Sequence, residues 1–217
     1  IASCLVGSEM CIRDRTIANY KPMKKNRIGQ ASIIPDAIAY RIQKQCKYDW
    51  QRTLLAILMY TGERVGAVRL LRIPDVYVSS ASRVVLPEIT FRSETRKRAG
   101  GKDGGVRQVP ISQKLREILG TYRIGGGEFL FPSPSDISKP VTVQAIDKFH
   151  RSAIARLGLE NEGYSLHSYR RTFITKLYNK GVNTRTIMAI TGHKSMSSLQ
   201  RYIDADPQKI RDAIDEI

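Results

Sequence analysis

Five side chains of this sequence have the types and the spacing that chemistry at a phosphate requires. Arg64 follows a Thr-Gly pair, and His193 follows a second such pair. His167 and Arg170 are three residues apart, so a helix would present both on one face. Tyr202 lies nine residues after His193. Arginines, histidines and a tyrosine together predict phosphoryl transfer without a metal ion.

The chemistry of a phosphodiester explains why these residue types belong together. Two arginines can hold its non-bridging oxygens through paired N–H donors and stabilise the charge that builds at phosphorus. A tyrosine hydroxyl has a pKa of about 10, so its ionisation at pH 7 costs roughly 4 kcal/mol, which a histidine base and nearby arginines reduce. A lysine can protonate the departing sugar oxygen. The product is a covalent phosphotyrosine, from which another hydroxyl can reseal the strand.

No cofactor is expected from the sequence. It contains no cluster with metal-ligand spacing and no GxxxxGK[ST] loop for a nucleotide. The three cysteines, Cys4, Cys11 and Cys46, make no closed disulfide framework and lack zinc spacing. A reducing, cytoplasmic location follows as the expectation.

Helices are expected to dominate the elements that position these side chains. Apolar spacing, caps and turn residues predict helices over 35–47, 50–60, 112–122, 142–157, 167–179, 184–190 and 195–202, and a last one from Pro207. Alternating apolar residues in 84–91 and 106–111 predict a hairpin with a long basic turn. The expected fold class is α+β, mainly α with one small antiparallel β-sheet.

The site residues lie in four short segments, TGERV (61–65), HSYRRTF (167–173), TGHKS (191–195) and SLQRYID (198–204). In order and spacing these segments resemble the conserved boxes of the tyrosine recombinases, the phage integrase family. The resemblance covers about residues 33–217 and implies a tyrosine recombinase catalytic domain, with a tail or linker over 1–32. Each residue alone has an ordinary structural interpretation; their joint occurrence favours the family.

The resemblance also implies a role for each site residue. Arg64 and Arg170 would bind the phosphate, and Tyr202 would be the nucleophile. His167 would transfer the proton, and His193 would orient the phosphate and support the site.

The family's catalytic lysine lies on the hairpin and has two candidates. ITFRSETRKR (89–98) is similar to the family strand that ends in a lysine, which favours Lys97. GKDGGVRQVP (101–110) is similar to the hairpin of other members, which would favour Lys102; Lys97 is preferred. Contacts with the DNA backbone, or simply a solvated face, are expected for Arg96, Arg98, Lys194 and Arg201. Lys102 is also expected to bind DNA, and Arg171 is expected to meet either a backbone phosphate or an acidic neighbour.

Three features depart from the family pattern. The family usually has an acidic residue three positions after the first arginine, where this sequence has Ala67. Glu63 is a candidate substitute, although its side chain is expected to point differently. The TGH segment replaces the commoner LGH, a change expected to be harmless. Only about 30 residues precede the expected catalytic domain, where most members carry a helical domain.

The charge of the chain predicts a polyanionic partner. Its 217 residues include 36 Lys and Arg against 20 Asp and Glu, a formal charge of +16. Double-stranded DNA fits this excess. A membrane does not, because the longest apolar run, Leu54 to Tyr60, is far too short to span one. A nucleoid-associated protein is therefore expected.

The two ends of the chain carry different expectations. CLVGSEMCIRDR, within residues 1–15, resembles translated adapter sequence from sequencing reads, so that this stretch is either an artefact or a tail. After Tyr202 the chain has five acidic and two basic residues with isoleucines at helical spacing. This segment is expected to dock on protein, in a neighbouring subunit of a homotetramer on DNA, or within its own subunit.

The leading hypothesis is a site-specific DNA recombinase that forms a 3′-phosphotyrosyl intermediate and a Holliday junction. Two alternatives stay open: a type IB topoisomerase-like enzyme, and a DNA-binding regulator whose catalysis has decayed. The complete set of five side chains favours catalysis, while Ala67 keeps the decayed regulator open.

Overall fold

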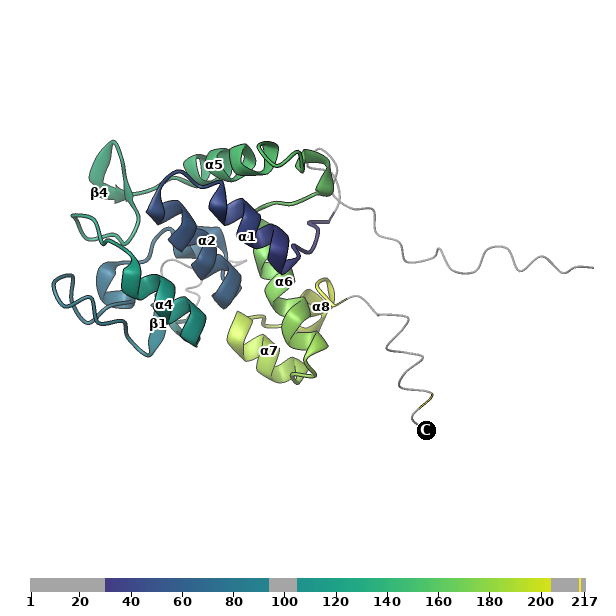
Figure 1. The fold of residues 1–217 in the computed structure, drawn as a ribbon. Coiled ribbons are helices and arrows are strands. Elements are labelled where there is room, and N and C mark those ends of the chain that lie inside the picture. The colour runs from purple at the N-terminus through teal and green to yellow at the C-terminus, as the bar shows by residue number, and fades with distance from the viewer. Residues whose placement is uncertain (1–29, 94–104, 204–214, 216–217) are drawn as a thin grey trace, which may run out of the picture.

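The computed structural model describes residues 30–93, 105–203 and Asp215 (Figure 1). The fold is mainly helical with small antiparallel sheets, which confirms the expected class. In chain order its elements are α1 (Asp36–Lys44), α2 (Asp49–Thr61), α3 (Val65–Val68), η1 (Ile73–Asp75), β1 (Glu88–Phe91), β2 (Arg107–Pro110), α4 (Gln113–Thr121), β3 (Pro132–Ser133), β4 (Asp136–Pro140), α5 (Val143–Ala155), η3 (Glu160–Glu162), α6 (Leu166–Asn179), α7 (Thr184–Thr191) and α8 (Met196–Gln200).

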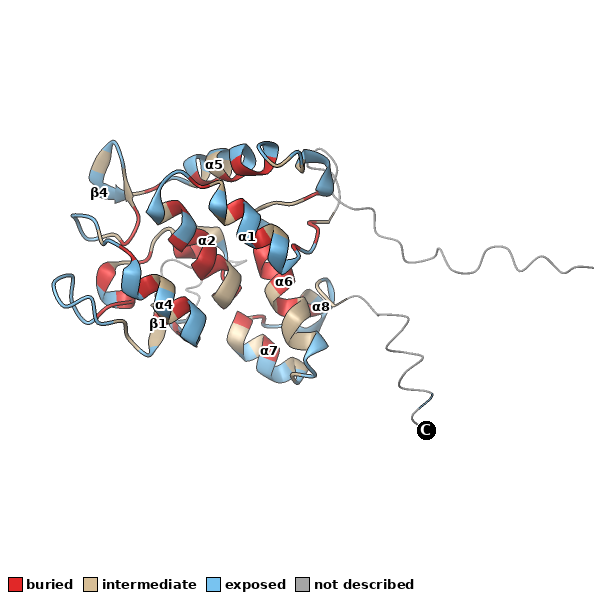
Figure 2. Ribbon diagram, viewed as in Figure 1, coloured by how far each residue is buried: buried red, intermediate tan, exposed pale blue. Residues whose placement is uncertain are grey.

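Helix α2 forms the centre of the molecule. Its residues 54–58 are all apolar and at most 1% exposed. A helix that is apolar all round must be buried on every side, and α2 packs against α1, α4 and α6. Figure 2 shows much of α2 and of the first half of α6 as buried. The C-terminal end of α2, which leads into Arg64, is therefore fixed in the core.

Helix starts follow the capping residues in the sequence. The hydroxyl of Ser112 accepts a hydrogen bond from the backbone N–H of Leu115 at the start of α4, and Thr142 accepts one from Ala145 at the start of α5. Such caps satisfy backbone donors that a helix leaves open at its first turn. The predicted helices over 112–122 and 142–157 are observed one to two residues shorter at each end.

The predicted hairpin is present, and its register buries one face. Strands β1 and β2 are antiparallel, with Ile89 opposite Val109 and Phe91 opposite Arg107. All four of these side chains are buried, as the period-2 alternation of a strand requires. Arg107 thus lies on the core face of β2.

A second hairpin, β3 and β4, was not expected from the sequence. Its strands pair antiparallel over 132–140 with an irregular register. The segment contains three prolines and three serines, which are typical of loops, and no apolar alternation. The hairpin is therefore recognised only from the backbone pairing of its two strands in the structure.

Two apolar clusters share helix α6. The larger cluster contains buried apolar side chains from Ile34 to Ile154 together with Tyr169 of α6. The smaller cluster contains Ile174, Ile187 and Leu199, with Tyr202 packed against it. Figure 1 shows α7 and α8 beside α6, below the larger body. The smaller cluster therefore sets the position of Tyr202.

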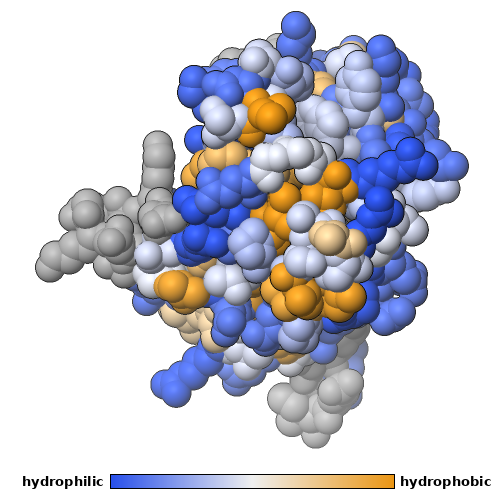
Figure 3. Space-filling model, turned by 90° about the vertical axis from the view of Figure 1, so that its left-hand side faces the viewer, coloured by the Kyte–Doolittle hydropathy of each residue, from blue (hydrophilic) through white to orange (hydrophobic). Residues whose placement is uncertain are grey.

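The molecular surface mixes both kinds of side chain. Figure 3 shows one face on which apolar residues are visible among mostly hydrophilic ones. None of the helices in the described ranges combines the length and the hydropathy that a membrane crossing requires.

Candidate active site

Two Thr-Gly turns of the same geometry frame the site. Thr61 ends α2 and Thr191 ends α7, and each hydroxyl donates to the carbonyl oxygen four residues earlier at 2.6 Å. Gly62 and Gly192 follow in the left-handed conformation, with φ of 60° and 69°. A side chain at Gly62 would also collide with Phe173. Glycine is required there both for its backbone conformation and for the close approach of α6.

Arg170 joins the two turns. Its Nη1 donates to the carbonyl oxygen of Gly62 at 2.8 Å, and its Nη2 donates to that of Thr191 at 2.9 Å. The side chain is 1% exposed. Both acceptors lie at helix C-termini, where the helix dipole is negative and favours a cation. The guanidinium group is therefore held by backbone groups of α2 and α7 at once.

Glu63 places a buried carboxylate beneath Arg170. It is ion-paired with Arg107 of β2, and its Oε1 lies 3.8 Å from Nη1 of Arg170. The same oxygen accepts the backbone N–H of Arg64 at 2.8 Å. Glu63 thus points toward the second arginine, while Ala67 is buried in α3.

Arg107 is a site residue that sequence reasoning did not single out. It was counted among the basic residues of the hairpin, whereas the structure buries it against Glu63 and Phe91. The signal that could have found it is the alternation of β2, which puts Arg107 on the same face as the buried Val109.

Arg64 precedes α3 with an exposed side chain. Burial lowers the pKa of Arg170, and the charge of Arg64 lowers it further, while Glu63 and a hydrogen bond with Tyr202 raise it. The positive charges of Arg64 and Arg170 thus act on each other. Such a locally positive region favours an anion.

Tyr202 and His167 form a hydrogen-bonded pair. The distance from His167 Nε2 to Tyr202 Oη is 2.8 Å. Tyr202 is half-buried, and its carbonyl oxygen accepts the hydroxyl of Thr175 at 3.1 Å, which fixes the backbone at this point. A histidine at this distance can take the proton of the phenol as it attacks.

His193 completes the site from the second Thr-Gly turn. Its Nδ1 lies 2.6 Å from the hydroxyl of Thr191, and its Nε2 lies 3.2 Å from Nη2 of Arg170. Its ring centroid is 5.3 Å from that of Tyr202. Burial, followed by the charge of Arg170, lowers the pKa of His193 to about 4, so the ring is neutral at pH 7.

The remaining predicted residues fall into three groups. Lys97, Lys102, Arg96 and Arg98 lie outside the described residues. Lys194 and Arg201 are exposed on the segment between α7 and Tyr202, and a DNA contact stays a prediction for them. Arg171 is buried and donates to the carbonyl oxygen of Ala31, so its position does not support the expected DNA contact.

The arrangement brings the predicted nucleophile and the predicted base together with two arginines. His167, Arg170, His193 and Tyr202 are linked by direct contacts, and the charge of Arg64 acts on Arg170 and His193. Over residues 30–93 and 105–203 there is no group of three or more His, Cys, Asp and Glu side chains that could hold a metal ion. Attack of a phenol on a bound phosphate is the chemistry these groups can perform together.

Comparison with known proteins gives a consistent family. Residues 31–209 match the model of the phage integrase family. A tyrosine recombinase of Pseudothermotoga lettingae is 27% identical over 189 residues, 85% of this chain and 60% of that protein. Tyrosine recombinase XerD of Brucella suis biovar 1 is 28% identical over 171 residues, 71% of this chain and 54% of that protein. The chain thus spans between half and two thirds of the length of these relatives.

Solved structures share the fold. XerA recombinase superposes with a TM-score of 0.65 at 23% identity, over 86% of this chain and 65% of that one. XerH site-specific recombinase bound to its difH substrate gives 0.60 at 20% identity, over 84% of this chain and 53% of that one. At such identities the likeness concerns the fold alone.

Proposed function

We propose, from the premise that this chain belongs to the phage integrase family, that residues 33–217 form the catalytic domain of a site-specific DNA recombinase. The observation that carries the proposal is the 2.8 Å contact between His167 Nε2 and Tyr202 Oη beside the buried guanidinium of Arg170. Relatives that are tyrosine recombinases support the same activity.

In the proposed reaction Tyr202 attacks the scissile phosphate. His167 accepts the phenolic proton, a bond forms between Oη and phosphorus, and the bond from phosphorus to the 5′-oxygen of the sugar breaks. The 3′-phosphotyrosyl product keeps the energy of the broken bond, so a 5′-hydroxyl from a second strand can reverse the step. Two such exchanges through a Holliday junction complete recombination without ATP.

Arg64 and Arg170 are proposed to hold the phosphate. Arg64 is exposed at the turn and free to close on a ligand. Nε of Arg170 is buried without a hydrogen-bond partner among the described residues. A buried donor of this kind is costly unless a ligand satisfies it, and a non-bridging phosphate oxygen would do so.

A suicide substrate tests the proposal. This DNA carries a nick next to the cleavage site, so that the short 5′ fragment diffuses away and the covalent complex accumulates. We expect a covalent protein–DNA band that is lost in Tyr202→Phe and kept in Tyr178→Phe, which alters another half-buried tyrosine of the same small apolar cluster. A band of unchanged intensity in Tyr202→Phe would refute the assignment, and no band in any variant would favour the decayed DNA-binding protein.

Lys97 is proposed as the acid that protonates the 5′-oxygen. Lys97→Ala should cleave ordinary DNA slowly but recover on a substrate with sulfur at the bridging 5′ position. A thiol has a pKa of about 8.5, far below that of an alcohol, so its thiolate leaves without a proton. Lys102→Ala is the matched control and should show no such rescue; the opposite pattern would assign the role to Lys102.

Double-stranded DNA is the proposed partner. Relatives of the same fold were solved on DNA, and the +16 charge of this chain favours a phosphate backbone. Raising salt from about 50 to 200 mM should weaken binding steeply, because each neutralised phosphate releases counterions. Affinity that is unchanged across this range would show that the basic faces are not the docking surface.

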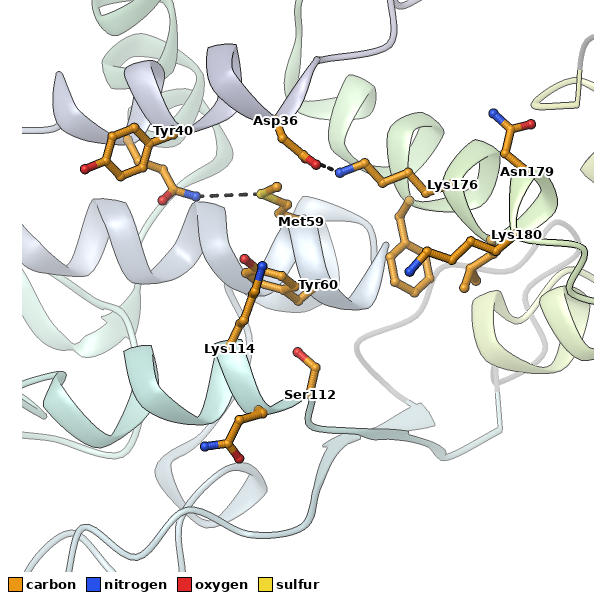
Figure 4. A pocket seen from close by; sticks show the side chains of 13 residues that line it. Asp36, Tyr40, Met59, Tyr60, Ser112, Lys114, Lys176, Asn179 and Lys180 are labelled. Carbon is orange, nitrogen blue, oxygen red and sulfur yellow. Dashed lines mark hydrogen bonds and ion pairs between the residues drawn. The ribbon is translucent and has the colours of Figure 1, made fainter.

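The C-terminal segment is proposed to dock into a neighbouring copy within a homotetramer. A pocket of about 800 Å³ lies between α1, α2, the start of α4 and α6 (Figure 4). Met59 and Tyr60 give it an apolar floor, and Lys114 and Lys180 stand at its edge. The sequence after Tyr202 combines isoleucines with five acidic residues, and so complements this pocket in both respects.

Deleting residues 207–217 tests the docking. We expect the truncated protein to bind DNA singly but to lose the multimeric complex in light scattering. Lys114→Glu with Lys180→Glu should have the same effect, whereas Arg123→Glu, an exposed basic residue outside the pocket lining, should assemble normally. Normal assembly of the truncated protein would reject the docking model.

A further inference from the structure

The hydroxyl of Thr191 lies between two groups with different hydrogen-bonding capacities. It is 2.6 Å from the carbonyl oxygen of Ile187 and 2.6 Å from Nδ1 of His193. A carbonyl oxygen can only accept, so the single hydroxyl proton is donated to Ile187. Thr191 must then accept a hydrogen bond from the ring, and Nδ1 of His193 carries a proton.

The second ring nitrogen gives the same answer independently. Nε2 of His193 lies 3.2 Å from Nη2 of Arg170. A guanidinium group has donors and no acceptor, so Nε2 must be the acceptor and carry no proton. Both contacts define one state of His193, the neutral ring with its proton on Nδ1.

We propose that Thr191 is a positioning residue that holds neutral His193 in its Nδ1–H tautomer, so that His193 supports Arg170 before DNA binds and can donate to the scissile phosphate only after it takes up a proton. The second half of this statement rests on the proposed function. A leucine at this position, as in an LGH segment, would offer the ring no acceptor. The threonine, expected from the sequence to be harmless, therefore acts with Arg170 to restrict the histidine to one tautomer.

The charges that face His193 favour this neutral state. The charged or titratable groups that act on the ring are Arg170 and His167 of α6, Arg64 before α3 and Arg107 of β2. Tyr202 also faces it, with the two ring centroids 5.3 Å apart. Burial and these groups lower the pKa of the ring to about 4. A phosphate anion between the arginines acts in the opposite direction and raises that pKa. Phosphate binding therefore favours proton uptake by His193, and this uptake becomes harder as the pH rises.

The first Thr-Gly turn offers a matched control. Thr61 is fully buried at the end of α2, and its hydroxyl makes the same 2.6 Å contact with the carbonyl oxygen four residues earlier. It accepts from the backbone N–H of Glu63 and not from a ring. Thr61→Val therefore removes an equivalent hydroxyl from an equivalent turn and leaves the histidine contact intact.

The tautomer can be read by NMR on the full chain with ¹⁵N-labelled histidine rings. The sequence has only three histidines, so His150→Gln and His167→Gln identify the remaining ring signals. Bare and protonated ring nitrogens resonate in separate ranges, and two-bond and three-bond couplings distinguish Nδ1 from Nε2. We expect a protonated Nδ1 and a bare Nε2 for His193 in the unaltered protein, in Thr191→Ser and in Thr61→Val.

In Thr191→Val only the contact with Arg170 still favours a bare Nε2, so we expect a mixture in which a protonated Nε2 appears beside the protonated Nδ1. A protonated Nε2 in the unaltered protein overturns the proposal without reference to any variant, as does an unchanged pattern in a folded Thr191→Val. If Thr191→Val fails to fold, the smaller Thr191→Ala takes its place.

Cleavage of the suicide substrate tests the catalytic half. The ratio of the Thr191→Val rate to the unaltered rate should increase with pH, because the variant can donate from a neutral ring while the unaltered protein must first bind a proton. The same ratio for Thr61→Val should stay flat. A pH-independent ratio for Thr191→Val would overturn this half. Absence of cleavage in every protein would instead contradict the proposed function, while the NMR result would stand.

Discussion

Replacing Glu63 with glutamine would remove the carboxylate charge that pairs with two buried guanidinium groups. Arg107 is 7% exposed and Arg170 is 1% exposed, so water cannot solvate the charges that remain. Breaking a buried ion pair from one side costs about 3–5 kcal/mol. Glutamine keeps the volume and an oxygen for the backbone N–H of Arg64, so we expect the lower end, about 3 kcal/mol.

Urea denaturation measures this loss. With a slope of about 2–3 kcal/mol per molar urea, the midpoint should fall by about 1 M. Asp49→Asn is the control: it breaks the exposed 3.4 Å pair with Arg52 and should cost less than about 1 kcal/mol. Combining Glu63→Gln with Arg107→Met should recover most of the stability, because it removes one of the two buried charges left facing each other.

Cleavage should respond differently from stability. The double variant still lacks the carboxylate beneath Arg170, so suicide-substrate cleavage should stay impaired even where stability is restored. A midpoint for Glu63→Gln within about 0.3 M of the unaltered protein, which is below 1 kcal/mol, would refute the reasoning that this carboxylate neutralises the buried arginines.

Three further predictions concern other parts of the chain. Burial lowers the pKa of His150 from 6.5 to about 4. The stabilisation from the neutral ring is therefore complete above pH 6.5, and the free energy of unfolding should decrease by up to about 3 kcal/mol as the pH falls to 4. His150→Leu should lessen this loss in acid denaturation curves. Gly62→Ala should cost at least about 1 kcal/mol in thermal unfolding, because residue 62 has a φ of 60° and faces Phe173; a stability equal to that of Gly66→Ala, where a Cβ meets nothing, would contradict this. Lys194→Gln should reduce the slope of log affinity against log salt by about 1 if this residue meets a phosphate, and an unchanged slope would leave it a solvated surface residue.

Most of the helical framework could be predicted because its signals are local. Ser112 and Thr142 precede apolar spacing of helical period, and the glycines at 62 and 192 end helices in the conformation that only they adopt easily. The expected hairpin followed from alternation. The hairpin β3–β4 could not be predicted, since its proline- and serine-rich strands lack any apolar face.

The residue types of the candidate site could be predicted from the sequence, but the contacts between its side chains could not. The five residues were named from motif spacing, and the structure brings them together. The roles of Glu63 and Arg107 depend on a contact across 44 positions of sequence, and a basic residue in a basic hairpin looks like a surface charge until its partner is known. The hydroxyl of Thr191 was overlooked for the same reason: its effect appears only when the ring of His193 folds back over it.

Arg170 also has a consequence for the way the molecule comes apart. Gly62 belongs to the turn after the central helix, whereas Thr191 belongs to the helix that packs on the small cluster with Tyr202. Arg170 therefore adds a polar connection between the two apolar clusters, which also share helix α6. A local opening that moves α7 away from α2 has to break at least one of these two hydrogen bonds. Under the proposed function, such an opening impairs phosphate binding by Arg170 and attack by Tyr202 together.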